Sequence, residues 1–334
     1  MEEYVRLLPR PVQINSLAEH WIREYRANRY LQCLNKNDLD ARIADIVSNM
    51  MALGDDGKYR PRFRVRNDHI YKIYAPIRNL DFLRMATDAW DEMRLRGLHV
   101  PVTLDSKLPQ NAKRLSDESW CQRPDWIAKS RLSLDKYEHP RMFFRFSKMQ
   151  WNNDFIHAGR VRISPASHYN DATAINALRD NELRLEWYDK QLARRALEVK
   201  DYFCLCLSSE YDYRLFVDFQ SDSCVAINDP AEFSKRLRHA IFKHNKAYPE
   251  YSIVQLTECP IIYVDPLALV PPENANEVHF CKHFRFAYQT EFRFVLTPAV
   301  DRQLQPFFLN LGTIADIAEM VTAPEGAEVV SVVR

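Results

Sequence analysis

The stretch Phe286-Ala-Tyr-Gln-Thr-Glu-Phe-Arg-Phe294 decides how the C-terminal part of this chain is expected to fold. Polar and aromatic residues alternate along it, which is typical of a half-buried strand. Successive side chains of a strand point to opposite faces, so Gln289 and Glu291 are predicted to share one face. The aromatic face would anchor the strand in a core and leave an exposed carboxylate beside an amide. Alternation alone also describes an antiparallel strand without any site.

Two earlier stretches predict strands that carry a polar residue in an apolar setting. One is Met142-Phe-Phe-Arg-Phe-Ser147, which contains Arg145. The other is Tyr202-Phe-Cys-Leu-Cys-Leu-Ser-Ser209, which ends with Ser208 and Ser209. In chain order the three strands supply an arginine, a serine and a glutamine two residues before a glutamate.

This order resembles the arginine–serine–glutamate class of mono-ADP-ribosyltransferases, in its variant with glutamine before glutamate. The resemblance implies that Arg145 holds the diphosphate or ribose of NAD and that Ser208 or Ser209 lines the nicotinamide side of the pocket. It implies that Glu291 binds the nicotinamide ribose and stabilises its cationic transition state, while Gln289 helps to select the acceptor. The strand end Ser208-Ser-Glu210 departs from the Ser-Thr-Ser common in those enzymes, so the choice between the two serines stays open.

The chain from Phe144 to Leu296 also resembles an uncharacterised bacterial domain family with Cys-x-Ser and Glu-x-Arg strands. Its landmarks read here Phe144-Arg-Phe146, Tyr169-Asn-Asp171, Cys206-Leu-Ser208, Ile262-Tyr-Val-Asp265, Lys282 and Glu291-Phe-Arg293. Tyr169 lies in a predicted loop, where its ring could cover a bound nicotinamide or simply be solvated.

The pattern of elements predicts an α+β fold in two domains. Residues 1–102 are expected to form a helical plus β-hairpin accessory domain, with helices near 16–25, 38–54 and 79–96. Residues 103–140 lack periodicity and are interpreted as a connector. Residues 141–334 are expected to form a split antiparallel β-sheet of the ADP-ribosyltransferase-like type. Helices are also predicted there at 174–199, after Asp229-Pro230, and near 313–321.

A row of basic residues marks the predicted hairpin of the first domain, with strands at 58–66 and 69–74. On a strand its side chains would project from one face, at a spacing that suits phosphates. The row consists of Lys58, Arg60, Arg62, Arg64 and Arg66. An edge strand protected from aggregation by positive charge, as Pro61 also suggests, explains the row equally well.

Composition excludes several other classes of protein. The 334 residues are 46% hydrophobic and contain six glycines, none in a dinucleotide-binding or phosphate-binding glycine motif. Seven cysteines without a Cys-x-x-Cys pair argue against disulfides and zinc ribbons, and we expect no metal. His279-Phe-Cys-Lys-His283 is interpreted as ordinary turn and strand residues rather than ligands. Without an apolar run long enough for a membrane span, a cytoplasmic protein is expected.

We therefore expect an NAD-dependent ADP-ribosyltransferase that modifies a macromolecular acceptor, with DNA or RNA as one hypothesis. The resemblance implies a bacterial toxin or phage-defence effector with a neutralising or effector-complex protein partner. The main alternative is a non-catalytic nucleic-acid- or partner-binding protein on the same fold. A nuclease is a third alternative, with little support because no cluster of Asp, Glu and Lys has metal-site spacing.

Overall fold

The computed structural model describes residues 14–53, 59–61, 77–99, 127–128, 140–170, 181–189, 191–212, 214–267, 275–299 and 303–323. The chain divides into two compact units. Unit 1 contains the N-terminal helices, and unit 2 contains the large sheet. The domain limits predicted from sequence, at 102 and 140, stay predictions.

Unit 1 is built on helices α2 (Ile14–Asn28), α3 (Lys36–Met50) and α4 (Ile77–Leu95), with a short 3-10 helix η1 (Tyr30–Cys33). Trp21 and Tyr25 recur at helical spacing on α2 and are both buried. After α4 the chain enters the left-handed region at Gly97, with φ 65°, and Leu98 N donates to Met93 O at 2.9 Å. Glycine adopts this conformation without steric cost, so the predicted helix end is confirmed.

Only a part of the predicted hairpin of unit 1 is described, because its second strand, 69–74, lies outside the described residues. The strand β2 (Tyr59–Pro61) includes Arg60, but its partner is β1 (Met51–Leu53), antiparallel, with Ala52 opposite Arg60. Met51 to Leu53 were predicted as the end of a helix, whereas α3 stops at Met50. The apolar residues Met51 to Leu53 continue the helical periodicity of α3 but suit a strand equally well. The pattern alone therefore placed the end of the helix too late.

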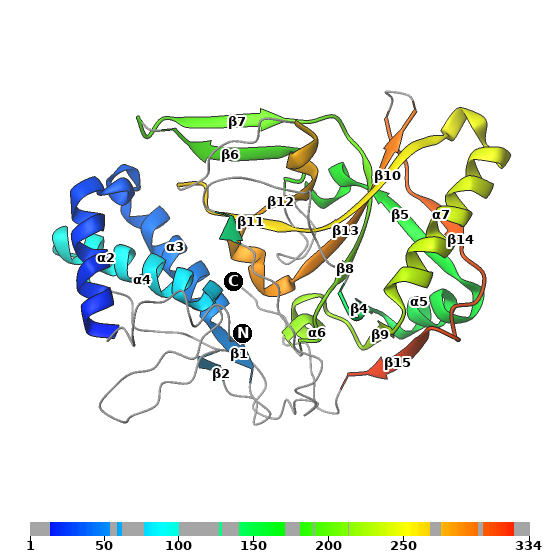
Figure 1. Cartoon of the computed structure of the whole chain (residues 1–334), viewed down its shortest axis with the longest axis horizontal. Helices are drawn as coiled ribbons and strands as arrows, with labels where there is room; N and C mark the ends of the chain where they lie inside the picture. The colour runs from blue at the N-terminus through cyan, green and yellow to red at the C-terminus, as the bar shows by residue number, and fades with distance from the viewer. Residues whose placement is uncertain are drawn as a thin grey trace, which may run out of the picture. The chain divides into compact units, whose positions relative to one another are not determined.

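Unit 2 is organised around an antiparallel sheet with the path β10–β13–β8–β4–β9–β15, to which β5 and β14 are added (Figure 1). The central strands are β4 (Phe143–Ser147), β8 (Phe203–Ser208) and β13 (Glu291–Pro298). Around them lie β5 (Arg160–Pro165), β9 (Ser223–Ile227), β10 (Ile253–Pro260), β14 (Phe307–Asn310) and β15 (Ala318–Thr322). Together with the helices, this confirms the predicted α+β class with antiparallel sheets.

The sheet opens at β8, because two different strands share one edge of it. At its C-terminal end β8 pairs with β4, through Phe144 opposite Ser208. At its N-terminal end β8 pairs with β5, through Ser164 opposite Cys204 and Pro165 opposite Phe203. Strands β4 and β5 therefore diverge along the middle of β8 and leave room for side chains between them.

One face of this sheet is covered by α7 (Pro230–Ala247), which begins as predicted at Asp229-Pro230. The Asp229 carboxylate caps the helix by accepting from Glu232 N at 2.9 Å. Alternate residues of the central strands pack below it, and the Phe143 ring lies 4.8 Å from that of Phe292. Burial of these apolar side chains is the main source of stability of the sheet.

Two predicted helices of unit 2 are wrong. Part of 174–199 forms an antiparallel hairpin of β6 (Arg184–Tyr188) and β7 (Arg194–Glu198), and 313–321 ends in β15. The charge pattern of this stretch is also typical of a helix with ion pairs along its surface. In the structure the charged side chains pair across the two strands, as in Arg184–Glu198 at 3.1 Å. Residues 171–180 lie outside the described part.

The remaining elements are short. They are β3 (Ile127–Ala128), α5 (Met149–Asn153), the π-helical η3 (Asp154–Ala158), η4 (Ala166–Asn170), α6 (Arg214–Asp218), η5 (Pro249–Tyr251), β11 (Ile262–Val264), η6 (Ala275–Phe280), β12 (Cys281–His283) and η7 (Phe284–Gln289). Strands β12, β11 and β3 form a small parallel sheet. Among the described helices, none combines the length and the apolar character that crossing a bilayer requires.

Candidate functional site

Three of the central strands bring Phe144, Ser208 and Glu291 into one row. Ser208 on β8 lies opposite Phe144 on β4 and opposite Glu291 on β13. On β8 and β13, Leu205, Leu207, Phe292 and Phe294 alternate into the hydrophobic core. The other face of both strands therefore carries the polar side chains, Ser208 and Glu291 among them.

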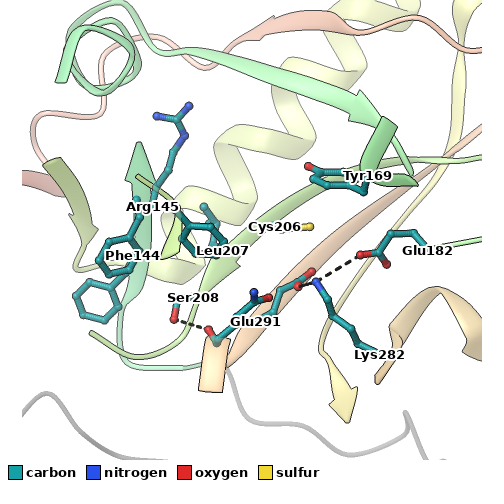
Figure 2. Close-up of a pocket in the computed structure, with 12 residues that line it drawn as sticks. Phe144, Arg145, Tyr169, Glu182, Cys206, Leu207, Ser208, Lys282 and Glu291 are labelled. Carbon is teal, nitrogen blue, oxygen red and sulfur yellow. Dashed lines mark hydrogen bonds and ion pairs between the residues drawn. The ribbon is translucent and has the colours of Figure 1, made fainter. Parts of the chain in front are cut away.

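A pocket of about 120 Å³ lies at this row, and we call it the split pocket because it sits where β4 and β5 diverge along β8. Figure 2 shows the side chains around it. Its lining consists of Phe144, Arg145, Phe146, Tyr169, Glu182, Cys206, Leu207, Ser208, Phe219, Lys282, Gln289 and Glu291. Arg145, Tyr169, Ser208, Gln289 and Glu291, all predicted as site residues, thus meet at one place.

Glu291 belongs to a buried cluster of four charged side chains, Glu182, Lys282, Glu291 and Arg293, which we call the ion cluster. Lys282 Nζ donates to one oxygen of Glu291 at 2.9 Å, and Arg293 Nη2 lies 2.7 Å from the other. Glu182 closes the cluster, 2.7 Å from Arg293 and 3.4 Å from Lys282. Two carboxylates and two cations balance formally, which is what allows all four to be buried.

The cluster sets the ionisation of Glu291. Burial alone raises the pKa of this carboxyl, but the charges of Arg293 and Lys282 outweigh it and lower the pKa to about 2. Its backbone N–H donates to the Tyr263 hydroxyl at 2.9 Å, which fixes the start of β13. Glu291 is therefore an ionised, rigidly held carboxylate at the pocket wall.

Arg145 differs from these cations because it has no ion pair with a carboxylate among the described residues. Its guanidinium donates to the side-chain oxygen of Asn152 and lies 5.0 Å from the centre of the Phe155 ring. In Figure 2 it points away from Glu291 and Ser208. Burial lowers the pKa of Arg145 to about 10, so it is charged at neutral pH and lacks an anionic partner.

The structure decides between the two serines. Ser208 lines the pocket, and its Oγ lies 2.8 Å from the Gln289 carbonyl oxygen and 2.7 Å from that of Glu210. Ser209 Oγ instead donates to the carbonyl oxygen of Thr290 at 2.8 Å. Ser208 therefore ties β8 to the turn before β13, and Ser209 supports that turn from outside the pocket lining.

Two predictions about the Gln-Thr-Glu stretch are wrong. Gln289 and Glu291 do not share a strand face, because Gln289 ends η7 and β13 begins only at Glu291. Between them Thr290 adopts the left-handed conformation, with φ 49° and ψ 44°, which breaks the alternation. Glu291 is also not exposed, since only 6% of its surface is accessible. Both residues still reach the pocket, from a turn and from a strand.

Tyr169 and Cys206 complete the wall between Arg145 and the ion cluster. Tyr169 lies in the short 3-10 helix η4, directly after β5. Burial is the main cause that raises the pKa of its hydroxyl, and the neighbouring Cys204 raises it further, so the hydroxyl stays neutral. The pKa of the Cys206 thiol is raised mainly by its side-chain hydrogen bond with Cys204 and further by burial. Cys206 is therefore a protonated thiol rather than a nucleophile.

Sequence reasoning missed Glu182 as a site residue and gave Lys282 no role beyond that of a landmark. Glu182 precedes β6 and reaches the pocket only through the tertiary fold, so no local pattern signals it. For Lys282, the signal was a lysine on a short strand directly after buried Cys281, since a buried lysine needs a carboxylate partner.

The basic row cannot be placed as a surface. Lys58, Arg62, Arg64 and Arg66 lie outside the described residues, and for Arg60 only the backbone of β2 is described. In the described part of the chain, no group of three or more His, Cys, Asp and Glu side chains is arranged to hold a metal.

Comparison of the chain with protein-family models, with curated proteins and with solved structures finds no match. The case for a function therefore depends on the geometry of the split pocket.

Proposed function

We propose that the protein is an NAD-dependent ADP-ribosyltransferase with its active site in the split pocket. One observation carries the proposal: residues predicted for this role in separate stretches, from Arg145 to Glu291, line a single pocket where the antiparallel sheet divides. No local periodicity would bring them together.

The state of Glu291 suits the proposed reaction. Cleavage of the bond between nicotinamide and ribose builds positive charge on the ribose ring, so a nearby ionised carboxylate stabilises the transition state more than the ground state. The lowered pKa keeps Glu291 ionised at neutral pH, and its two cationic partners hold it in place. Gln289 would hydrogen-bond the incoming acceptor.

Arg145 suits the diphosphate. A half-buried guanidinium that has no carboxylate partner among the described residues favours an anion, and its planar fork binds phosphate oxygens through charge-assisted hydrogen bonds. The pocket of about 120 Å³ is smaller than the roughly 300 Å³ or more of most ligand pockets. It would therefore enclose only the nicotinamide end of NAD, with Tyr169 against that ring and the diphosphate directed toward Arg145.

A second function is favoured by the ion cluster itself. Lys282 and Arg293 already neutralise the Glu291 carboxylate, which weakens its attraction for a cationic ribose. This favours the alternative of a non-catalytic protein that binds a nucleotide or a partner. Binding of NAD without release of nicotinamide would distinguish this alternative from the transferase.

We further propose a nucleic-acid acceptor, with the basic row from Lys58 to Arg66 providing salt-dependent attraction. Adenine-labelled NAD should then label DNA or RNA, and labelling confined to protein would contradict the proposal. Replacement of Arg62, Arg64 and Arg66 by Ala should flatten the salt dependence of nucleic-acid binding. A toxin or defence effector with a neutralising partner is the setting that such an activity implies.

Nicotinamide release from NAD tests the transferase directly. The purified protein is incubated with NAD alone and with DNA, RNA or a protein mixture, and free nicotinamide is quantified by chromatography. Release in at least one mixture is expected. If NAD binds but no mixture yields nicotinamide, the non-catalytic alternative replaces the transferase.

A further inference from the structure

The carboxylate of Glu182 lines the split pocket, but the proposed reaction gives it no role. Only 3% of this side chain is exposed. Its Oε2 is buried and accepts no hydrogen bond from the described residues, although Arg293 Nη1 lies 2.7 Å away. A buried acceptor without a well-aligned donor costs free energy. Glu182 would therefore gain from a donor that moved closer to it.

Lys282 is the donor within reach. Its Nζ lies 2.9 Å from Glu291 and 3.4 Å from Glu182, and Figure 2 shows it between the two carboxylates. The two distances differ by 0.5 Å, so a small rotation of the side chain would reverse their order. Lysine carries three donors on a flexible four-carbon stem, so it can change carboxylates without losing its hydrogen bonds.

The other cation of the ion cluster, Arg293, is held firmly in place. Its Nε donates to Glu291 at 2.8 Å, and its Nη1 donates to the His279 carbonyl oxygen at 2.8 Å and to the Tyr202 hydroxyl at 3.1 Å. It is 0% exposed, whereas Lys282 lines the pocket. Arg293 therefore anchors Glu291, and Lys282 is the partner that a ligand in the pocket can displace.

The proposed reaction supplies a charge that would displace it. When the bond between nicotinamide and ribose breaks, its electron pair leaves with nicotinamide, which becomes neutral, and the ribose carries the positive charge. This charge develops beside Glu291, where it repels the ammonium of Lys282. With Lys282 on Glu182, the ribose takes the vacated oxygen of Glu291, and each charge keeps a partner of opposite sign.

We propose that Glu182 is a positioning residue of the transferase, which takes Lys282 from Glu291 as the ribose becomes cationic. The inference rests on the proposed function. It explains how a carboxylate that is neutralised by two cations in the free protein can stabilise a cationic transition state. The contact of Glu291 with the ribose would then form only as the charge develops, which is the kind of interaction that accelerates a reaction.

Steady-state nicotinamide release tests the role of Glu182, because it separates kcat from KM. Glu182→Gln keeps the shape of the side chain but offers Lys282 no anion, so kcat should fall about tenfold or more while KM changes less than about twofold. The matched control is Glu258→Gln, which removes a buried carboxylate, paired with Arg238, outside the split pocket. This control should keep the kcat of the wild type.

Two further variants separate exchange from charge and from folding. Lys282→Arg keeps the charge, but its planar fork can hold both carboxylates at once, so exchange stops and kcat should fall as in Glu182→Gln. The double variant Glu182→Gln with Lys282→Met removes one charge of each sign, so the buried cluster stays balanced and should fold. It has no lysine to displace, so its kcat should be about tenfold above that of Glu182→Gln.

Three results would overturn the proposal while the transferase stands. They are a wild-type kcat in Glu182→Gln, a wild-type kcat in Lys282→Arg, and a double variant no faster than Glu182→Gln, which would mean that Glu182 serves only the fold. Circular dichroism confirms that each variant is folded before its rate is compared. If the wild type releases no nicotinamide in any mixture, the proposed function itself fails and this inference fails with it.

Discussion

Two buried carboxylates, Glu92 in unit 1 and Glu291 in unit 2, each lie between two cationic side chains. Glu92 pairs with Arg29 at 2.9 Å and Arg96 at 2.6 Å, and Glu291 pairs with Lys282 at 2.9 Å and Arg293 at 2.7 Å. In both, burial raises the pKa and the cationic partners reverse the effect, so both pKa values are lowered.

The two differ in what else they reach. The Glu92 side chain is fully buried, at 0% exposure, and also accepts from the Tyr25 hydroxyl, so its oxygens serve the packing of α2 against α4. Glu291 lines the split pocket, beside Ser208 and Gln289. A lowered pKa and a pair of cations therefore do not mark a functional carboxylate by themselves, whereas a position at a pocket does.

The largest expected effect is on stability, and it tests how alike the two carboxylates are. Glu291→Gln leaves the buried cations Lys282 and Arg293 with Glu182 as their carboxylate partner in the ion cluster, so one positive charge is buried without compensation and the free energy of unfolding should fall by about 3 to 5 kcal/mol. Glu92→Gln should cost less, because its partners Arg29 and Arg96 are 38% and 23% exposed and stay partly solvated. Urea unfolding measures both. A cost below about 1 kcal/mol for Glu291→Gln, as for a surface pair, would contradict the role of the buried ion cluster in stability.

The second largest expected effect is on the binding of NAD. It concerns Arg145, which has no carboxylate partner among the described residues. Arg145→Lys removes the planar fork, so NAD should bind about tenfold more weakly by calorimetry. Arg238→Lys is the control, because Arg238 is already paired with Glu258 outside the split pocket. Equal loss of affinity in both variants would mean that Arg145 has no special role in binding.

The difference in stability between wild type and Glu291→Gln should be smaller in acid than at neutral pH. The pKa of Glu291 is lowered from 4.5 to about 2, so its stabilisation is complete above pH 4.5 and is lost as the pH falls toward 2. The stability difference between the two proteins should shrink across that window. Urea midpoints measured at a series of pH values provide the check, and a constant difference would contradict the lowered pKa.

The smallest effect is an absence of change. Glu291 stays ionised and Arg145 stays charged between about pH 5 and about pH 8, so the rate of nicotinamide release should show no step from either group. A step in the wild-type rate within this range would contradict the ionisation states assigned to Glu291 and Arg145.

Several residues that the sequence singled out line one pocket, although some of the elements that carry them were predicted wrongly. Arg145 and Ser208 lie on strands whose aromatic and aliphatic alternation is unambiguous. Ser208 faces the pocket, whereas the Arg145 side chain points away from Ser208 and Glu291, toward Asn152 and Phe155. The helix at Asp229 and the end of α4 at Gly97 were also predictable, since capping and left-handed glycine are local effects.

The failures arise where tertiary structure overrides a local pattern. Thr290 takes a left-handed conformation that nothing in Gln-Thr-Glu predicts, and it ends the expected strand face. Charges in 184–198 support a helix or a hairpin equally well until pairing decides. Glu182 joins the ion cluster through contacts distant in sequence, and without it the burial of Glu291 could not be foreseen.

The most direct test of the central claim compares nicotinamide release by the wild type, Glu291→Gln and Glu92→Gln, each confirmed as folded by circular dichroism. Each variant loses a buried carboxylate that has two cationic partners, and only Glu291→Gln loses one that lines the split pocket. We predict release by the wild type and Glu92→Gln, and none above background by Glu291→Gln. Release by Glu291→Gln at the wild-type rate would contradict the assignment of Glu291 as the catalytic residue.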